Sequence, residues 1–339
     1  MTCKIYSDGA LIPEGKQPVI MMYPFFGQPS SAQSDPDSDR FAEYLSAASG
    51  LFELVSKEKA DVFVLPFDFT FEEKYKQVIT DFVEDARRLG KKTMLFYNAD
   101  DDRPIVMDDV VVYRTSFYLK TRNPYEHAFP GWSVDFLKKY YHGNHTERMF
   151  REKPVVGYCG YIDYLQPSMK ISLLNTFFPV RTKSWEKLRG AAVRSIYRSG
   201  KVIANVIIRN GFWASGMDDK QRARLEYVEN LNNSDYALVC RGGGNFSYRL
   251  YEVMSLGRIP VFINTDCVLP FMESIPWKEM MVWVESWDVR DTDRLISDFH
   301  HRLDDQKFRE IQYEIRRCYE EYISPLGFFT QLSRTFRGQ

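Results

Sequence analysis

A glycine-rich turn flanked by charged residues is the part of the sequence best suited to binding a phosphorylated ligand. The residues concerned are Arg241, Gly242, Gly243, Gly244, Asn245, Ser247, Arg249 and Glu252. An apolar stretch at 236–240 predicts a strand before the turn, and helical spacing begins at Phe246. A glycine turn that opens a helix presents free backbone N–H groups and the positive end of the helix dipole to an anion. Glycine also allows close approach of the backbone to a ligand.

Three arginines near this turn could neutralise a diphosphate. Arg241 begins the turn, Arg249 lies within the following helix, and Arg209 follows another strand predicted at 202–208. The planar guanidinium suits this task because it can bind two oxyanion oxygens at once. Glu252 lies three residues after Arg249, on the same helix face. We expect Glu252 either to accept hydrogen bonds from ribose hydroxyls or to hold Arg249 in place.

Two well-known glycine motifs are absent from the sequence. The dinucleotide fingerprint G-x-G-x-x-G does not occur, and neither does the P-loop G-x-x-x-x-G-K-S/T. Their absence weakens an interpretation as a nicotinamide-dependent enzyme or a nucleoside triphosphatase. The residues alone leave open whether the ligand is a sugar nucleotide or another phosphorylated molecule.

The first half of the chain alternates between predicted strands and helices. Strands are predicted at 18–23, 61–67, 93–97 and 110–113, and helices at 40–58 and 71–89. This alternation is typical of a parallel sheet with helices on its faces. Residues 121–152 contain proline, glycine, histidine and many charges without a periodic run, so we place a domain boundary at 152.

The second half repeats the same alternation. Strands are predicted at 154–158, 202–208, 236–240, 259–263 and 282–285, and helices at 183–198, 218–230, 246–256 and 291–322. Ligands of parallel sheets bind beyond the carboxyl ends of the strands, where the glycine turn lies. The sequence therefore predicts two Rossmann-like α/β domains, 1–152 and 153–339, that face a cleft and are closed by the last helices.

Composition excludes several classes of protein. The 45 basic and 46 acidic residues nearly cancel, which argues against a nucleic-acid binder that neutralises phosphates over a whole face. Five scattered cysteines form no C-x-x-C pair, so neither a disulfide framework nor a zinc site is indicated. No apolar run reaches about 18 residues, and residues 1–10 lack the order of a signal peptide. We expect a cytoplasmic protein without a transmembrane segment, for which peripheral membrane contact stays open.

Several segments resemble the exostosin-type glycosyltransferases. The segments are 233–242 (NSDYALVCRG), 246–252 (FSYRLYE), 257–261 (GRIPV), 269–271 (LPF), 275–277 (IPW) and, upstream, 60–67 (ADVFVLPF). The match is dense over 230–290, present near 60–67, and vague elsewhere. Two positions depart from the pattern: Cys240 replaces a common proline, and Pro276 a common aspartate. These departures leave the identity of the donor open.

The resemblance implies a GT-B fold with the nucleotide-sugar donor in the second domain and a glycan acceptor in the first. It implies an inverting hexosyl- or pentosyltransferase of surface polysaccharide or glycoprotein glycans that needs no metal, with a UDP-sugar favoured over a GDP-sugar. Arg241, Ser247, Arg249 and Glu252 fall on the donor motif, whereas Arg209 is placed only by its position after a strand. Animal and plant members usually carry an N-terminal anchor, so we expect a bacterial or virus-encoded enzyme.

Inverting transfer needs a base that accepts the proton of the acceptor hydroxyl. We favour Asp68, because it follows the strand predicted at 61–67 and should point toward the crevice. Other candidates are Asp100, Asp102, Glu126, His127 and Asp135. The run Asp100 to Asp102 could also chelate a metal, but a solvated turn in the other domain from the phosphate turn is the favoured interpretation.

The remaining candidates have simpler interpretations. His300 and His301 are adjacent in a helix and do not face one another, so we expect them at the surface. Trp132, Trp185 and Trp213 are expected to serve packing. Two alternatives to the exostosin-like enzyme remain: a fucosyltransferase-like GT-B enzyme that uses a GDP-sugar, and a non-catalytic nucleotide- or glycan-binding protein of the same fold.

Overall fold

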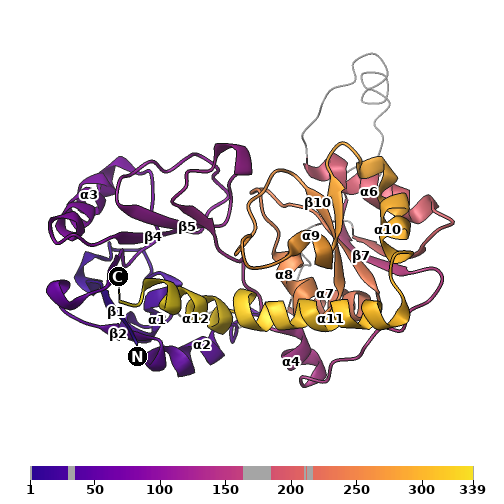
Figure 1. Cartoon of the computed structure of the whole chain (residues 1–339), viewed down its shortest axis with the longest axis horizontal. Helices are drawn as coiled ribbons and strands as arrows, with labels where there is room; N and C mark the ends of the chain where they lie inside the picture. Colours follow the sequence, from indigo (N-terminus) through magenta and orange to yellow (C-terminus); the bar gives the residue numbers. More distant parts are fainter. Residues whose placement is uncertain (1, 30–34, 163–184, 210, 212–216, 339) are drawn as a thin grey trace, which may run out of the picture.

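The structure is a computed structural model that describes residues 2–29, 35–162, 185–209, 211 and 217–338. It contains two parallel sheets, each with helices packed against it (Figure 1). Among the described helices, none combines the length and the apolar character needed to cross a bilayer.

The first sheet has six strands in the order β2-β1-β3-β4-β5-β6, and every pairing is parallel. The strands are β1 (Cys3–Tyr6), β2 (Phe52–Leu54), β3 (Val62–Val64), β4 (Thr93–Tyr97), β5 (Val110–Arg114) and β6 (Glu126–Ala128). Successive residues of β3 and β4 point to opposite faces, as strand geometry requires. Thus Val62 and Val64 pack on the side of α2 (Ala42–Ala47), and Phe63 packs on the side of α3 (Glu73–Arg88).

The second sheet has five parallel strands in the order β11-β10-β9-β7-β8. The strands are β7 (Val155–Tyr161), β8 (Ile203–Arg209), β9 (Tyr236–Val239), β10 (Ile259–Asn264) and β11 (Val282–Glu285). Its helices are α6 (Trp185–Arg198), α7 (Met217–Asn232), α8 (Tyr248–Ser255), α9 (Trp277–Met280), α10 (Thr292–His300) and α11 (Asp305–Cys318). Their apolar faces share one core with the strands.

The last helix returns to the first domain. In Figure 1, α11 runs beside the second sheet and α12 (Pro325–Phe336) continues in nearly the same direction to the first. Ser324 begins α12 by accepting the N–H of Gly327 at 3.0 Å. A side chain at Gly327 would lie 2.2 Å from the Glu320 carbonyl oxygen, so glycine permits this close turn. Phe329 stacks on Tyr44 with ring centroids 4.2 Å apart.

The packing therefore crosses the division predicted at residue 152. Phe136 and Leu137 of α4 (Phe136–Tyr141) belong to the core of the second domain, although the predicted division gives them to the first. Conversely, Phe328 and Phe329 of α12 belong to the core of the first.

Two predictions of secondary structure were wrong. Residues 18–23 form no strand of the sheet, and the first strand is β1. The helix predicted at 40–58 ends at Ala47, and β2 follows Gly50 and places Phe52 in the core. The helical segment predicted at 291–322 is confirmed and consists of α10, α11 and a π-helical turn.

Truncating Phe329 tests whether α12 is part of the first domain's core. We expect Phe329→Ala to lower the free energy of unfolding by about 3–5 kcal/mol, because the side chain is fully buried and its loss leaves a cavity. Leu225→Ala, at a half-exposed position on α7, is the control and should cost less than about 1 kcal/mol. Urea unfolding measures the free energy of unfolding of both variants. Equal losses in the two would show that α12 packs only loosely on the first domain.

Candidate functional site

The glycine turn connects β9 to α8, as the sequence predicts. The N–H of Gly242 donates to the Phe246 carbonyl at 3.1 Å and closes the turn. Ser247 occupies the N-cap of α8 with extended backbone, and its side chain makes no capping hydrogen bond. The first N–H groups of α8 therefore lack the usual side-chain acceptor, which leaves them available to an anion.

Arg241 is held by both domains. One terminal nitrogen donates to the Tyr118 hydroxyl at 2.7 Å, and the other donates to the Gly243 carbonyl at 2.8 Å. The Nε atom is buried and finds no partner in the described part of the chain. A buried donor without an acceptor is costly, so this guanidinium has unused capacity for an oxyanion.

Arg249 points from α8 toward the end of β7. Its guanidinium carbon lies 4.7 Å from the ring centre of Tyr158 and 5.3 Å from that of Tyr227. A terminal nitrogen donates to the Cys159 carbonyl at 2.8 Å. Two aromatic faces and one carbonyl thus position the cation. Within the described part of the chain no carboxylate forms a hydrogen bond with it, so it is suited to neutralise a ligand anion.

Glu252 is held by α7 rather than by Arg249. Its carboxylate accepts from the Tyr227 hydroxyl at 2.6 Å and from Arg224 at 3.2 Å. Arg224 also donates to Asp37 at 2.5 Å, so it joins the two domains. Arg224 and Tyr227 escaped the sequence analysis, although their spacing of three residues places them on one helix face.

Asn245 connects the two domains through both its backbone and its side chain. The N–H donates to the Ser116 hydroxyl at 2.8 Å, and the carboxamide donates to the Phe117 carbonyl at 3.0 Å. Its oxygen accepts from the Thr265 hydroxyl at 2.7 Å. In the structure, the Asn245 side chain thus makes a contact between the two domains. Its role in donor binding stays a prediction.

Arg209 turns away from the glycine turn. Its guanidinium donates to the Ala223 carbonyl at 2.5 Å and pairs with Glu226 at 2.9 Å, both on α7. Arg209 lies on β8, which pairs with β7. The β7 residue Cys159 accepts a hydrogen bond from Arg249 through its backbone carbonyl. A donor role for Arg209 would require it to leave Glu226.

Asp68 follows the first sheet's buried strand, as predicted. Its side chain is reached by solvent, yet the protein packed around it raises its pKa to about 6, against the opposing effects of the Asn98 N–H and Lys16. An accessible carboxylate with a raised pKa can take up a proton near neutral pH.

Asp100 lies against the glycine turn of the other domain. The positions that side chains of Gly243 and Gly244 would take are 2.9 and 2.6 Å from its carboxylate oxygens. Asp100 is exposed in a bend, as the interpretation as a solvated turn predicts, and it also contacts the glycine turn, which the sequence did not indicate.

Two of the other candidate bases, Glu126 and Asp135, have structural partners. Glu126 forms a fully buried pair with Arg114 at 2.6 Å. Asp135 caps α4 and pairs with Arg316 at 2.7 Å. Asp102 is exposed.

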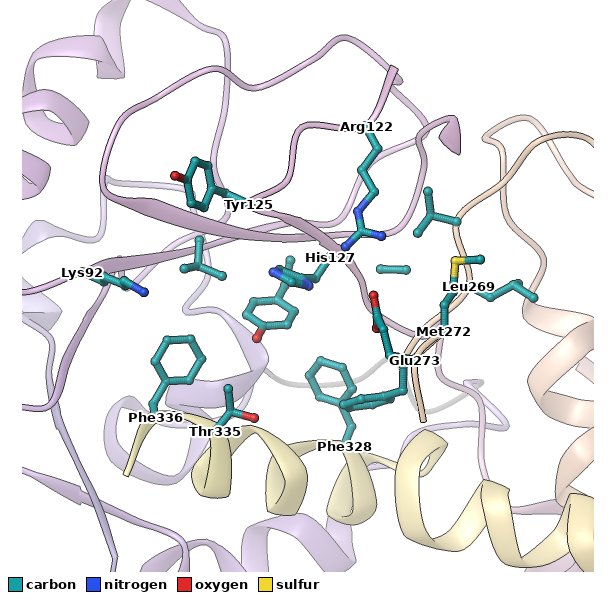
Figure 2. A pocket seen from close by; sticks show the side chains of 15 residues that line it. Lys92, Arg122, Tyr125, His127, Leu269, Met272, Glu273, Phe328, Thr335 and Phe336 are labelled. Atoms are coloured by element: carbon teal, nitrogen blue, oxygen red, sulfur yellow. The ribbon is translucent and has the colours of Figure 1, made fainter. Parts of the chain in front are cut away.

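His127 lies in a cavity of about 300 Å³ between the first sheet's edge, residues 268–273 and α12. Figure 2 shows Arg122 and Glu273 pointing into the same cavity. Burial and the charge of Arg122 lower the pKa of His127, and Glu273 opposes this shift. The residues of the glycine turn do not line this cavity, so His127 is separate from the proposed donor site.

His300 and Trp132 have packing roles, whereas His301 is exposed, as expected. His300 is fully buried, bonded to Tyr236 and to the Arg151 carbonyl, so its expected surface position was wrong. Trp132 is buried in the first core, as expected. Trp185 begins α6. Trp213 lies outside the described residues.

Comparisons with known proteins concern mainly the second domain. Residues 180–299, which include the glycine turn, match the Exostosin GT47 domain. An Exostosin-1 homolog of Caenorhabditis elegans is 29% identical over 128 residues, which are 36% of this chain and 32% of that protein. A probable beta-1,4-xylosyltransferase IRX10 of Arabidopsis thaliana is 38% identical over 71 residues, 21% of this chain and 17% of that protein. The matches thus span about a third or less of these relatives.

Two solved structures are similar only in outline. TarM has a TM-score of 0.39 at 9% identity, covering 84% of this chain and 56% of that one. The calicheamicin glycosyltransferase CalG4 has a TM-score of 0.33 at 10% identity, covering 99% and 98%. The fold assignment therefore rests on the two sheets themselves.

The two parallel α/β domains, whose strand-following loops meet at one junction, have the arrangement of a GT-B fold. The glycine turn and α8 lie within the matched segment. Residues 180–299 are thus similar to the Exostosin GT47 domain.

The buried pair beside the junction yields a test. Glu126→Gln should cost about 3–5 kcal/mol of unfolding free energy, because it leaves the Arg114 charge buried without its counter-ion. The control is Glu43→Gln, which removes an exposed pair with Lys138 and should cost at most about 1 kcal/mol. Urea unfolding compares them; a negligible loss in Glu126→Gln would mean that water reaches the pair.

Proposed function

We propose that this protein is an inverting glycosyltransferase that moves a sugar from a nucleotide-sugar donor to a glycan hydroxyl. The observation that carries the proposal is the glycine turn before α8, flanked by Arg241 and Arg249, inside a segment that matches the Exostosin GT47 domain. A UDP-sugar is favoured over a GDP-sugar, and the arginines take the charge-neutralising role that a metal has in other enzymes.

The donor diphosphate binds at the start of α8 in this proposal. The N–H groups at the start of the helix donate to one phosphate, and Arg249 and Arg241 neutralise the rest of the charge. These cations count most when the bond between the sugar and the diphosphate breaks, because negative charge then develops on the leaving group. Glu252, fixed by Tyr227 and Arg224, is suited to accept from ribose hydroxyls.

Asp68 is the proposed catalytic base. Its carboxylate takes the proton of the acceptor hydroxyl while the hydroxyl oxygen attacks the anomeric carbon on the side opposite the diphosphate. The first domain supplies this residue at the carboxyl edge of its sheet, and the second domain supplies the diphosphate site, so the acceptor is held between them.

Nucleotide binding tests the donor site directly. We expect UDP at about a hundredfold excess over its Kd to stabilise the protein by about 2.7 kcal/mol, seen as a higher melting temperature. Arg249→Ala should abolish the shift, and Arg249→Lys should retain part of it, because the charge survives but the fork does not. Arg222→Ala, on the exposed part of α7, is the control and should behave as wild type. Wild-type protein that responds to neither UDP nor GDP would overturn the proposal.

The pH dependence of turnover tests Asp68. Because the base must be deprotonated, kcat/KM should rise with pH, reach half of its maximum at a pH of about 6, and level off at higher pH. Asp68→Asn should lower kcat by about 10²–10⁴-fold and remove this limb, whereas Asp102→Asn should change neither. The measurement is nucleotide release from UDP- and GDP-sugars with oligosaccharide acceptors. An unchanged pH limb in Asp68→Asn would assign the base elsewhere; nucleotide binding without any turnover would favour a non-catalytic binding protein.

A further inference from the structure

The Asp100 carboxylate fills the space in front of the phosphate turn. A side chain at Gly243 would lie 2.9 Å from its Oδ2 atom, and one at Gly244 would lie 2.6 Å from Oδ1 and 3.0 Å from its Cα. The two glycines thus have a local role: they make room for Asp100. A turn suited to an anion is already in contact with an anionic group of the other domain.

The loop around Asp100 is fixed in place by neighbouring groups. The Ser116 hydroxyl donates to the Asp100 carbonyl at 3.2 Å and accepts the N–H of Asn245 at 2.8 Å. Thr115 donates to the Ala99 carbonyl at 3.0 Å, and the buried Arg114 donates to the Asp101 carbonyl at 2.7 Å. One hydroxyl therefore links the backbone of the Asp100 loop to the glycine turn, and the contact is part of the domain junction.

Asp100 also lacks a counter-ion. No Lys, Arg or His in the described ranges forms an ion pair with it, whereas the neighbouring Asp101 pairs with Arg103. Arg241, the cation that begins the turn, bonds to Tyr118 and the Gly243 carbonyl rather than to Asp100. A diphosphate at this turn would therefore meet an unpaired negative charge, and like charges at such short range repel one another.

We propose that Asp100 occupies the place of a donor phosphate in the empty protein and must be displaced when a nucleotide diphosphate binds. Asp100 thereby sets the affinity of the donor site and favours release of the nucleotide product. The inference rests on the proposed nucleotide-sugar site and adds the residue that limits binding there. It also means that the Ser116–Asn245 contact loosens when the nucleotide enters.

The test compares nucleotide affinity in two matched variants. Asp100→Asn keeps the size of the side chain and removes its charge, and Asp102→Asn does the same at an exposed position two residues away. Titration calorimetry with UDP and with GDP, in EDTA, measures Kd. Asp100→Asn should bind about tenfold more tightly or better, with slower dissociation by stopped flow, because the repulsion is gone. Asp102→Asn should bind as wild type does.

Asp100→Ala controls for a new contact between the introduced asparagine amide and the nucleotide, because it has no amide. It should also bind the nucleotide more tightly than wild type does. Unchanged or weaker binding in both Asp100 variants, with a wild type that binds, would overturn the inference and leave the proposed function intact. A wild type that binds no nucleotide would overturn both. Repeating the titration with Mg²⁺ gives the last outcome: if the cation tightens binding to wild type but not to Asp100→Asn, Asp100 is a metal ligand and the inference fails.

Discussion

Parallel pairing in both sheets is the constraint on which the rest of the structure depends. A parallel strand can be reached only by a crossover connection, so every strand of a sheet ends at the same edge. The segments that follow those ends, which carry Asp68, Asp100, Ser116 and the glycine turn, therefore collect at two edges. Because residues 116–121 of one domain bond to the turns of the other, the two edges meet, and functional side chains distant in sequence become neighbours.

The junction is built from polar contacts, and the anchor beside it is apolar. Arg224 links Asp37 to Glu252, and Asn245 links Ser116 to Thr265. Each such hydrogen bond contributes only modestly to the net free energy of folding. By contrast, the aromatic side chains of α12 are buried in the first core. This division allows the site's contacts to rearrange while the domains stay attached.

Much of the site could be predicted from the sequence because its signals are local. The strand before the glycine turn and the helix after it both follow from short-range patterns, although the helix begins at Tyr248 and Ser247 is its N-cap rather than part of it. The short strand β1 was missed, because four residues with alternating burial give too little periodicity. The contact of Asp100 with Gly243 and Gly244 could not be predicted either, since it joins residues about 140 positions apart through the docking of two domains.

The return of α12 to the first domain also constrains how the chain folds during synthesis. Phe328 and Phe329 fill the core beside Tyr44 and Trp132, so that core stays incomplete until residues near 330 have left the ribosome. The second domain, by contrast, has nearly all its strands and helices by residue 318. Although domains usually complete in order from the N-terminus, here the domain translated first is completed last. Until α12 docks, aromatic side chains of that core stay uncovered, and exposed apolar surface of this kind makes folding intermediates prone to aggregate.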